Sequence, residues 1–255
     1  GLLGRDHPLY FRHGRSIALR EADLIIISGM PCDFRLNYGR ALNQDAIHIA
    51  INRSSEDLKK NKKPDLAIQA DPATFLVNLS QNLSKTYQNI LKKDLWGEWF
   101  NNLREYNKNK KKKIHNFSME NTQYLNPLAF LNQVNTHIED DDILIGDGGD
   151  FVATTSYIVK PPGPLTWLDP GPFGTLGAGA GFAIAAQLVH PDSQVWLFWG
   201  DGAAGYGLSE IDTFVRHQLP IISIIGNDAG WTQITRDQVE YLNDDVATKL
   251  EFSDY

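Results

Sequence analysis

Continuous apolar runs alternate with helix-like segments along the whole chain. In the first part, three runs of mainly apolar residues are predicted to be strands: 23–29, 46–51 and 66–70. The helices predicted around them cover 12–22, 36–44 and 73–82. Short apolar strands separated by helices are typical of a parallel sheet that is covered on both faces.

The second part of the chain repeats this alternation. The strands predicted there cover 142–145, 165–168, 194–199 and 220–225. The predicted helices cover 127–138, an apolar segment that ends at residue 188, and 206–217. The fold class is therefore predicted to be α/β, with two doubly wound parallel-sheet domains, the first of them Rossmann-like. In such sheets ligands bind at the carboxyl ends of the strands, where polar and glycine-rich clusters follow at 146–150, 200–205 and 226–230.

The charge changes sign along the chain, although the net charge is −7. Residues 121–255 hold 18 acidic and 4 basic residues, and residues 1–120 hold 13 acidic and 20 basic ones. This step predicts two modules joined near residue 120. With the predicted elements, the chain is divided into a domain at 1–82, a helix and lysine-rich linker at 83–124, and a second domain at 125–255. No aromatic residues interleave the lysine runs at 59–63 and 108–113. We interpret these runs as solvated surface and expect no nucleic-acid partner.

The composition and the lengths of the apolar runs argue against a disulfide-rich or cysteine-rich zinc protein and against a membrane-spanning segment in this chain. Cys32 is the single cysteine, so a disulfide framework or a cysteine-rich zinc site within the chain is impossible. The apolar runs are much shorter than the ~18 residues of a membrane-spanning helix. No membrane span is therefore expected within residues 1–255.

The segment Gly200 to Gly205 allows two chemistries. It matches G-x-G-x-x-G after a predicted strand, which is typical of a dinucleotide site in a dehydrogenase. However, the Asp201 carboxylate would repel a pyrophosphate by about 1 kcal/mol or more at close range. A Mg²⁺ ion between the two groups would reverse the sign of this interaction. Asp201 therefore favours a site for a metal-bound diphosphate.

Asn227 ends the next predicted strand, 26 positions after Asp201. Its amide oxygen is a hard ligand suited to Mg²⁺, and neighbouring strand ends can place both side chains around one ion. The backbone N–H groups of Gly202, Ala203 and Ala204 are expected to open a helix, which favours an anion there. Alternatively, Asp201 could simply cap the helix that follows it. This structural role would explain the residues at 200–205, but it would not explain why Asn227 stands at the end of the next strand.

These residues resemble the signature of thiamine diphosphate enzymes: Gly200-Asp201-Gly202, 24 residues, then Asn227. The segment 169–177 resembles the one that these enzymes place against the aminopyrimidine ring. Three further segments resemble the central domain of the branch that contains acetolactate synthases and 2-hydroxyacyl-CoA lyases: 4–8, 22–26 and 35–37. The resemblance covers nearly the whole chain except the lysine-rich linker.

The resemblance implies a role for each matching position. Asp201 and Asn227 would bind Mg²⁺ through their side chains and Ala229 through its carbonyl oxygen. Leu176 would bend the cofactor, and the Gly174 carbonyl would accept a hydrogen bond from its 4′-amino group.

The same resemblance places Gly149 near the diphosphate, where the helix start predicted at Gly202 and Ala203 also favours an anion. The family commonly has a second asparagine where this chain has Asp228, which changes the local charge. A central domain of this type holds FAD or an adenine nucleotide, but Asn52-Arg53 stands where an acidic residue is common. The nucleotide in this chain, FAD or an adenine nucleotide, therefore stays open.

By resemblance, the function is cleavage of a 2-hydroxyacyl-CoA to an aldehyde and formyl-CoA. Acetolactate synthase-type condensation of 2-oxo acids, or cofactor binding without catalysis, are the alternatives. The activating glutamate is expected upstream of Gly1, and the last domain is expected to continue beyond Tyr255. The resemblance also implies a homodimer or homotetramer and an anchor in the endoplasmic reticulum membrane outside this chain; without such an anchor the protein would be cytoplasmic.

Overall fold

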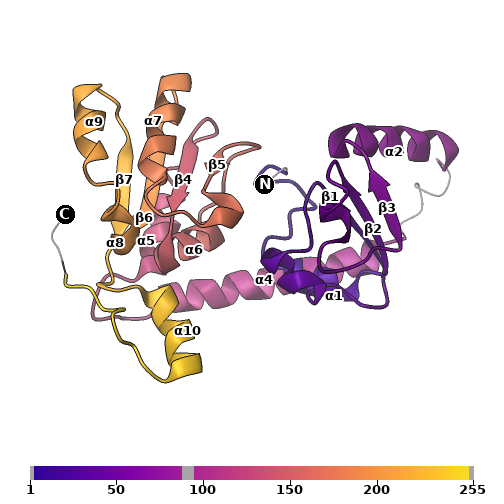
Figure 1. The fold of residues 1–255 in the computed structure, drawn as a ribbon, viewed down its shortest axis with the longest axis horizontal. Coiled ribbons are helices and arrows are strands. Elements are labelled where there is room, and N and C mark those ends of the chain that lie inside the picture. Colours follow the sequence, from indigo (N-terminus) through magenta and orange to yellow (C-terminus); the bar gives the residue numbers. More distant parts are fainter. Residues whose placement is uncertain (1–2, 88–94, 253–255) are drawn as a thin grey trace. The chain divides into compact units, whose positions relative to one another are not determined.

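The computed structural model describes residues 3–87 and 95–252 of the protein. The chain divides into two compact units, one formed by Phe11–Lys111 and the other by Gly1–Tyr10 together with Lys112–Tyr255. Each unit contains one parallel β-sheet with helices between its strands (Figure 1). The predicted α/β class with two parallel sheets is confirmed.

The first unit contains a three-stranded sheet in the order β1-β2-β3. The strands are β1 (Leu24–Ser28), β2 (Ile47–Asn52) and β3 (Leu66–Gln69), and the α-helices flanking them are α1 (Arg15–Glu21) and α2 (Pro72–Thr86). α2 begins at the carboxylate of Asp71, which accepts a hydrogen bond from the Thr74 backbone N–H at 2.9 Å. These elements agree with the predicted strands and with the helices predicted at 12–22 and 73–82.

The predicted helix at 36–44 is wrong. The chain forms a short 3₁₀ segment, η1 (Phe34–Gly39), and a second one, η2 (Asp57–Lys59), lies before β3. In η1, Asn37 and Tyr38 have left-handed backbone angles with φ of 48° and 54°. A residue in this conformation interrupts a right-handed helix, so the polar segment folds as consecutive turns.

The lysine-rich segment predicted as a linker is helical. α4 (Gly97–Ser118) is 22 residues long and includes the lysines at 108–113. Lysine is a good helix former, because its straight side chain loses little rotamer freedom in a helix. Part of the predicted linker, residues 88–94, lies outside the described residues. Among residues 3–87 and 95–252, no helix is both long and apolar enough to cross a membrane.

The second unit contains a four-stranded sheet in the order β5-β4-β6-β7. Its strands are β4 (Ile143–Asp147), β5 (Trp167–Leu168), β6 (Val195–Gly200) and β7 (Ile222–Gly226), all parallel to their neighbours. The chain passes from β4 to β5 on one side and then to β6 on the other side. The reversal creates a topological switch point between the carboxyl ends of β4 and β6, where such sheets bind ligands.

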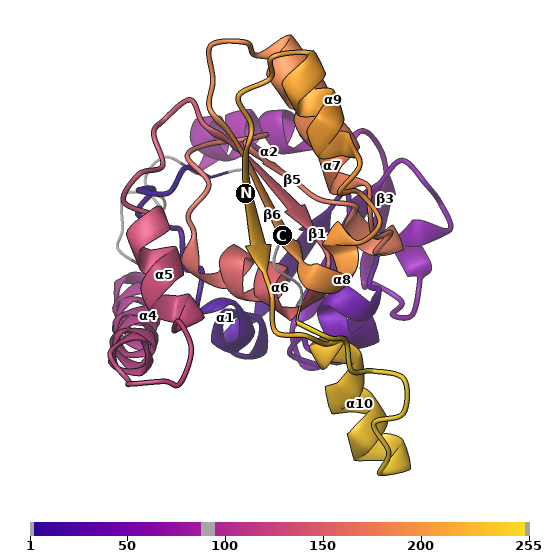
Figure 2. The ribbon, with the colours of Figure 1, turned by 90° about the vertical axis from the view of Figure 1, so that its left-hand side faces the viewer.

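Helices cover both faces of this sheet (Figure 2). α5 (Pro127–Val134) and α6 (Gly149–Ile158) pack on one face, and α7 (Gly179–Val189) and α9 (Glu210–Arg216) pack on the other. The short α8 (Asp201–Ala204) directly follows β6, α10 (Thr232–Leu242) follows β7 and contacts α6, and a 3₁₀ turn, η3 (Gly171–Phe173), precedes α7. The helices predicted at 127–138, up to 188 and at 206–217 are present, the first and last of them shorter than expected. The sequence did not reveal α6 and α10.

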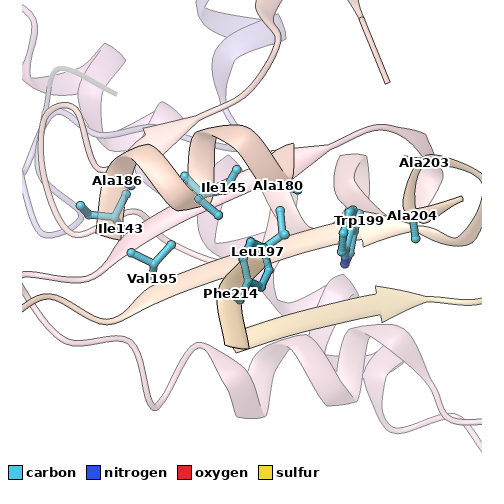
Figure 3. Close-up of a cluster of buried hydrophobic side chains, with 11 residues drawn as sticks. Ile143, Ile145, Ala180, Ala186, Val195, Leu197, Trp199, Ala203, Ala204 and Phe214 are labelled. Atoms are coloured by element: carbon cyan, nitrogen blue, oxygen red, sulfur yellow. The ribbon is translucent and has the colours of Figure 1, made fainter. Parts of the chain in front are cut away.

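Alternate residues of β4 and β6 point to opposite faces of the sheet. The cluster on one face joins these strands to α7 and α9 (Figure 3): Ile143, Ile145, Val195, Leu197, Trp199, Ala180, Ala183, Ala186 and Phe214. The cluster on the other face joins them to α5 and α6: Leu144, Trp196, Phe198, Leu131, Val134 and Val152. All eleven residues of β4 and β6 are buried, so the positions of their carboxyl ends are fixed by packing on both sides.

A test of this packing compares two glycines of the second unit. Gly146 lies in β4, and an added Cβ would lie 2.8 Å from Val152 Cγ1 and 3.0 Å from Trp167 Cζ2. We expect Gly146→Ala to lower the free energy of unfolding by about 1–3 kcal/mol through overpacking. Gly181→Ala in α7 meets no atom within 4 Å and is expected to raise it by about 0.5–1 kcal/mol. Urea unfolding measures both, and equal midpoints would contradict the packing described.

Candidate functional site

A cavity of about 350 Å³ lies at the carboxyl ends of β4, β6 and β7. Four segments line it: the turn after β4, the glycine-rich segment before α7, the start of α8 and the loop that leads from β7 into α10. The first and third of these segments flank the switch point of the sheet. The cavity therefore has the position at which doubly wound sheets bind ligands.

Asp201 and Asn227 are brought to the same edge of the sheet. Gly200 of β6 pairs in register with Gly226 of β7, so the next residue of each strand lies at the same level. Asp201 is buried, and its Oδ2 accepts a hydrogen bond from the Gly230 backbone N–H at 3.2 Å. The loop after β7 thus folds against Asp201, as a shared ion site requires.

Ala229 lies in this same loop with a left-handed φ of 55°. Its backbone N–H donates to Asn227 Oδ1 at 3.2 Å, and its carbonyl oxygen accepts from the Leu250 N–H at 2.8 Å. A carbonyl oxygen has two lone pairs, so this hydrogen bond is compatible with coordination of a metal ion. Two of the predicted ligands, Asn227 and Ala229, therefore lie in the one loop whose Gly230 contacts the third, Asp201.

The donor set fits a hard cation that shares its ligands with an anion. Asp201, Asn227 and Ala229 could supply a carboxylate, an amide and a carbonyl oxygen, and Mg²⁺ prefers oxygen ligands in an octahedron. Within the part of the chain that the structure describes, no group of three or more His, Cys, Asp and Glu residues is arranged to hold a metal. An ion held by only one protein carboxylate fits a site in which phosphate oxygens and water complete the coordination.

The electrostatics of the cavity also require a cation for anion binding. Three carboxylates line the cavity, those of Asp150, Asp201 and Asp228. Burial raises the pKa of Asp228, a hydrogen bond with Thr232 opposes the rise, and the carboxylates of Asp201 and Asp150 add to it. Without a bound cation these negative charges would repel a diphosphate.

The helix N-terminus at this cavity belongs mainly to α6. α8 is only four residues long, and the Gly202 N–H donates to the carboxylate of Asp201 at 2.8 Å. α6 has ten residues and begins at Gly149, which lines the cavity with a φ of 86°. The helix N-terminus that favours an anion was expected at 202–204, but α6 provides it better. The sequence did not reveal α6 because the helix begins with glycines.

An ion pair links α6 to α10 above this helix end. Arg236 of α10 contacts the Asp150 carboxylate in the first turn of α6. The arginine offsets a negative charge beside the diphosphate position predicted at Gly149. The two residues are 86 positions apart, so no sequence pattern pointed to the pair.

The predicted wedge residue packs against the turn after β4. Leu176 lines the cavity, and an added Cβ on Gly148 would lie 2.1 Å from Leu176 Cδ2. Gly174, which also lines the cavity, has a left-handed φ of 59°. Ala203 and Gly202 also line the cavity, and the indole of Trp231 covers Gly202. The predicted cofactor-binding positions therefore line one cavity except Asn227, which lies between the lining residues Gly226 and Asp228.

Asp147 is a polar residue of this site that the sequence did not single out. It is the last residue of β4 and is completely buried. Its carboxylate accepts hydrogen bonds from the backbone N–H groups of Gly177 and Gly179, at 3.1 and 2.8 Å. Burial raises the pKa of Asp147, and these two hydrogen bonds oppose the rise. Its position at the end of an apolar strand was the available signal.

The first unit was predicted to hold FAD or an adenine nucleotide. At the carboxyl end of β2, the Arg53 guanidinium forms an ion pair with Asp71 at the start of α2. The hydrogen bonds from Thr74 and the Arg53 side chain lower the pKa of Asp71 to about 2. This end of the sheet therefore presents a paired carboxylate and arginine.

Comparison with known protein families identifies a matching domain in each of the two units. Residues 1–79 match the family described as thiamine pyrophosphate enzyme, central domain, and residues 147–254 match its C-terminal TPP-binding domain. The dinucleotide interpretation of Gly200 to Gly205 is therefore not supported, because this segment lies within the second match.

Curated relatives match along the whole chain. The chain is 48% identical over 261 residues to 2-hydroxyacyl-CoA lyase 2 of Mus musculus and 46% identical to that of Homo sapiens, with 100% of the chain aligned. It is 33% identical over 232 residues to a probable acetolactate synthase of Mycobacterium bovis, with 91% of the chain aligned. The chain spans about two fifths of the length of these relatives, 40% of the first two and 41% of the third. The chain thus belongs to the thiamine pyrophosphate (thiamine diphosphate) enzymes and contains the central domain and the TPP-binding domain of that family.

Proposed function

We propose that the protein containing this chain is a thiamine diphosphate- and Mg²⁺-dependent carbon–carbon lyase, which cleaves a 2-hydroxyacyl-CoA to an aldehyde and formyl-CoA. The observation that carries the proposal is the identity of 46–48% to proteins named 2-hydroxyacyl-CoA lyase 2, compared with 33% to the probable acetolactate synthase. The cavity at the switch point supports it, because its donor set suits a metal-bound diphosphate.

Two groups of residues would hold the metal ion and the diphosphate. Asp201, Asn227 and the Ala229 carbonyl would hold Mg²⁺, and the N-terminus of α6 at Gly149 would face the diphosphate. When bound, thiamine diphosphate supplies a nucleophilic carbon and an electron sink.

The organic part of the cofactor would meet a largely apolar wall. Leu176, Phe151, Trp231 and Ile234 are the large apolar residues that line the cavity, and they would exclude water from the reacting bond. Leu176 would orient the rings, and the Gly174 carbonyl would accept a hydrogen bond from the 4′-amino group. We expect the glutamate that activates the aminopyrimidine to come from outside residues 1–255.

The proposal extends to assembly and location. We propose a small-molecule substrate, a homodimeric or homotetrameric full-length protein and attachment to the endoplasmic reticulum membrane through a segment outside this chain. In the first unit, an adenine nucleotide or FAD is proposed, with Arg53 as a candidate phosphate partner at the end of β2. Acetolactate-type condensation is the second candidate function, favoured by the likeness to the probable acetolactate synthase.

The metal site is tested by exchanging one carboxylate at a time. We expect Asp201→Asn to weaken thiamine diphosphate binding at least about 100-fold in the presence of Mg²⁺, because a direct ligand should matter more than the outer partners of a metal site. Asp228→Asn is the matched control in the same cavity and is expected to leave the affinity equal or slightly tighter, since it removes a negative charge. Isothermal titration calorimetry measures both, and a chelator should reproduce the Asp201→Asn result.

Two outcomes would contradict this assignment. Equal losses in both variants would mean that the cavity responds to general charge and not to a ligand. NAD binding that survives or improves in Asp201→Ala, with no thiamine diphosphate binding by the wild type, would instead revive the dinucleotide interpretation.

The substrate is tested with the full-length protein. With thiamine diphosphate and Mg²⁺, we expect 2-hydroxyacyl-CoA to yield an aldehyde and formyl-CoA, and pyruvate to yield no acetolactate. Chromatography of the products measures both reactions, and Asp201→Asn is the inactive control. Acetolactate formation would favour the second candidate, and cofactor binding without either product would favour a non-catalytic protein.

A further inference from the structure

Asp147 connects the central strand of the second sheet to the glycine-rich segment before α7. It is 0% exposed, and each carboxylate oxygen has its own backbone donor: Gly177 N–H at 3.1 Å and Gly179 N–H at 2.8 Å. The two donors lie 30 and 32 positions further along the chain. One carboxylate therefore fixes two points of a segment that contains few other side chains.

The two glycines let the segment approach this carboxylate closely. Gly177 has a φ of +83°, and an added Cβ on Gly179 would lie 2.5 Å from Asp147 Cβ. Any side chain at 179 would therefore force the segment away from the strand. The contact between Asp147 and the two glycines is therefore tightly packed and leaves no room for a side chain at position 179.

The fixed segment carries Leu176, directly before Gly177. The Leu176 side chain packs over Gly148, which is the residue directly after Asp147. The same corner of the sheet thus holds the backbone of the segment through Asp147 and receives the leucine side chain at Gly148. Leu176 is held in place between these two contacts and faces the cavity.

A buried carboxylate is an expensive way to join two segments. Among the described residues, no Lys or Arg forms an ion pair with Asp147. Burying a charge without an opposite charge is costly even when hydrogen bonds satisfy it, and apolar packing often stabilises a fold as well or better. Stability alone therefore does not explain this residue, whereas fixing two backbone N–H groups at defined positions does.

We propose that Asp147 is a positioning residue that holds Leu176 against the bound thiamine diphosphate through Gly177 and Gly179. This inference rests on the proposed function, because it assigns the leucine a bound cofactor to orient. Asp147 itself does not touch the cofactor in this proposal. Its contribution is to limit the positions that the Leu176 side chain can occupy.

The test uses Asp147→Asn in the full-length protein. An asparagine of the same shape accepts one of the two N–H groups, but its NH₂ group opposes the other donor. We expect exchange of the thiazolium C2 proton of bound thiamine diphosphate, measured by NMR after acid quench, to slow by about tenfold, the effect of losing one buried hydrogen bond. The dissociation constant for thiamine diphosphate should stay within about threefold, because the Mg²⁺ and diphosphate contacts are unchanged.

Asp142→Ala provides the matched control. Asp142 is also a buried carboxylate, at the opposite end of β4, and it accepts hydrogen bonds from Trp196 Nε1 at 2.8 Å and the Glu139 N–H at 3.1 Å. Its variant should lose stability in urea as Asp147→Asn does, but it should leave proton exchange at the wild-type rate. This separates a positioning role from a structural one.

A double variant and an independent substitution in the glycine-rich segment test the same constraint. Asp147→Asn combined with Leu176→Ala should exchange no more slowly than Leu176→Ala alone, because both changes remove the same constraint. Gly177→Ala, whose Cβ would lie 2.7 Å from Tyr206 Cβ, should slow exchange in the same way without altering the carboxylate, and it serves if Asp147→Asn does not fold.

The outcomes distinguish this inference from the proposed function. Wild-type exchange in both Asp147→Asn and Gly177→Ala, or additive losses in the double variant, would overturn the positioning role while the cofactor assignment stands. A wild-type protein that binds no thiamine diphosphate would overturn the proposed function and this inference with it.

Discussion

The burial of β4 and β6 on both faces is the constraint on which the rest of the site depends. Every residue of these two strands is buried between α5 and α6 on one side and α7 and α9 on the other. The side chains of both strands pack between these helices along their whole length, and the carboxylates of Asp147 and Asp201 follow at the carboxyl ends of β4 and β6. The rigid core thereby delivers the functional groups to one fixed place.

Charge at that edge decides what can bind there. The cavity presents carboxylates and the N-terminus of α6, two features with opposite preferences for an anion. Arg236 offsets Asp150, and a divalent cation at Asp201 would offset the remaining repulsion. A diphosphate accompanied by Mg²⁺ suits this arrangement, whereas a bare dinucleotide phosphate does not. The same balance explains why a glycine-rich fingerprint alone was ambiguous.

Local sequence patterns predicted the strands well and the helices unevenly. The strands are short apolar runs, and burial on both faces makes such runs visible without knowledge of the partners. The glycines Gly148 and Gly149 hide the start of α6, although Val152 and Ile158 of this helix are buried. α10 has no buried residue, so its position in the sequence is not marked by a segment of the core. The segment 36–44 failed for the opposite reason, because the left-handed Asn37 and Tyr38 interrupt a pattern that looked helical.

The sequence by itself determined the class of fold, the family resemblance and the placement of Asp201 and Asn227 at one edge of the sheet. That placement could be predicted because both residues directly follow strands, and strand ends in a parallel sheet meet at one edge. Only the tertiary structure decided that Asp147 holds Gly177 and Gly179, and that Arg236 meets Asp150. These contacts join residues between 30 and 86 positions apart, through the packing of separate elements. No local periodicity records such a distance, so it becomes visible only once the chain has folded.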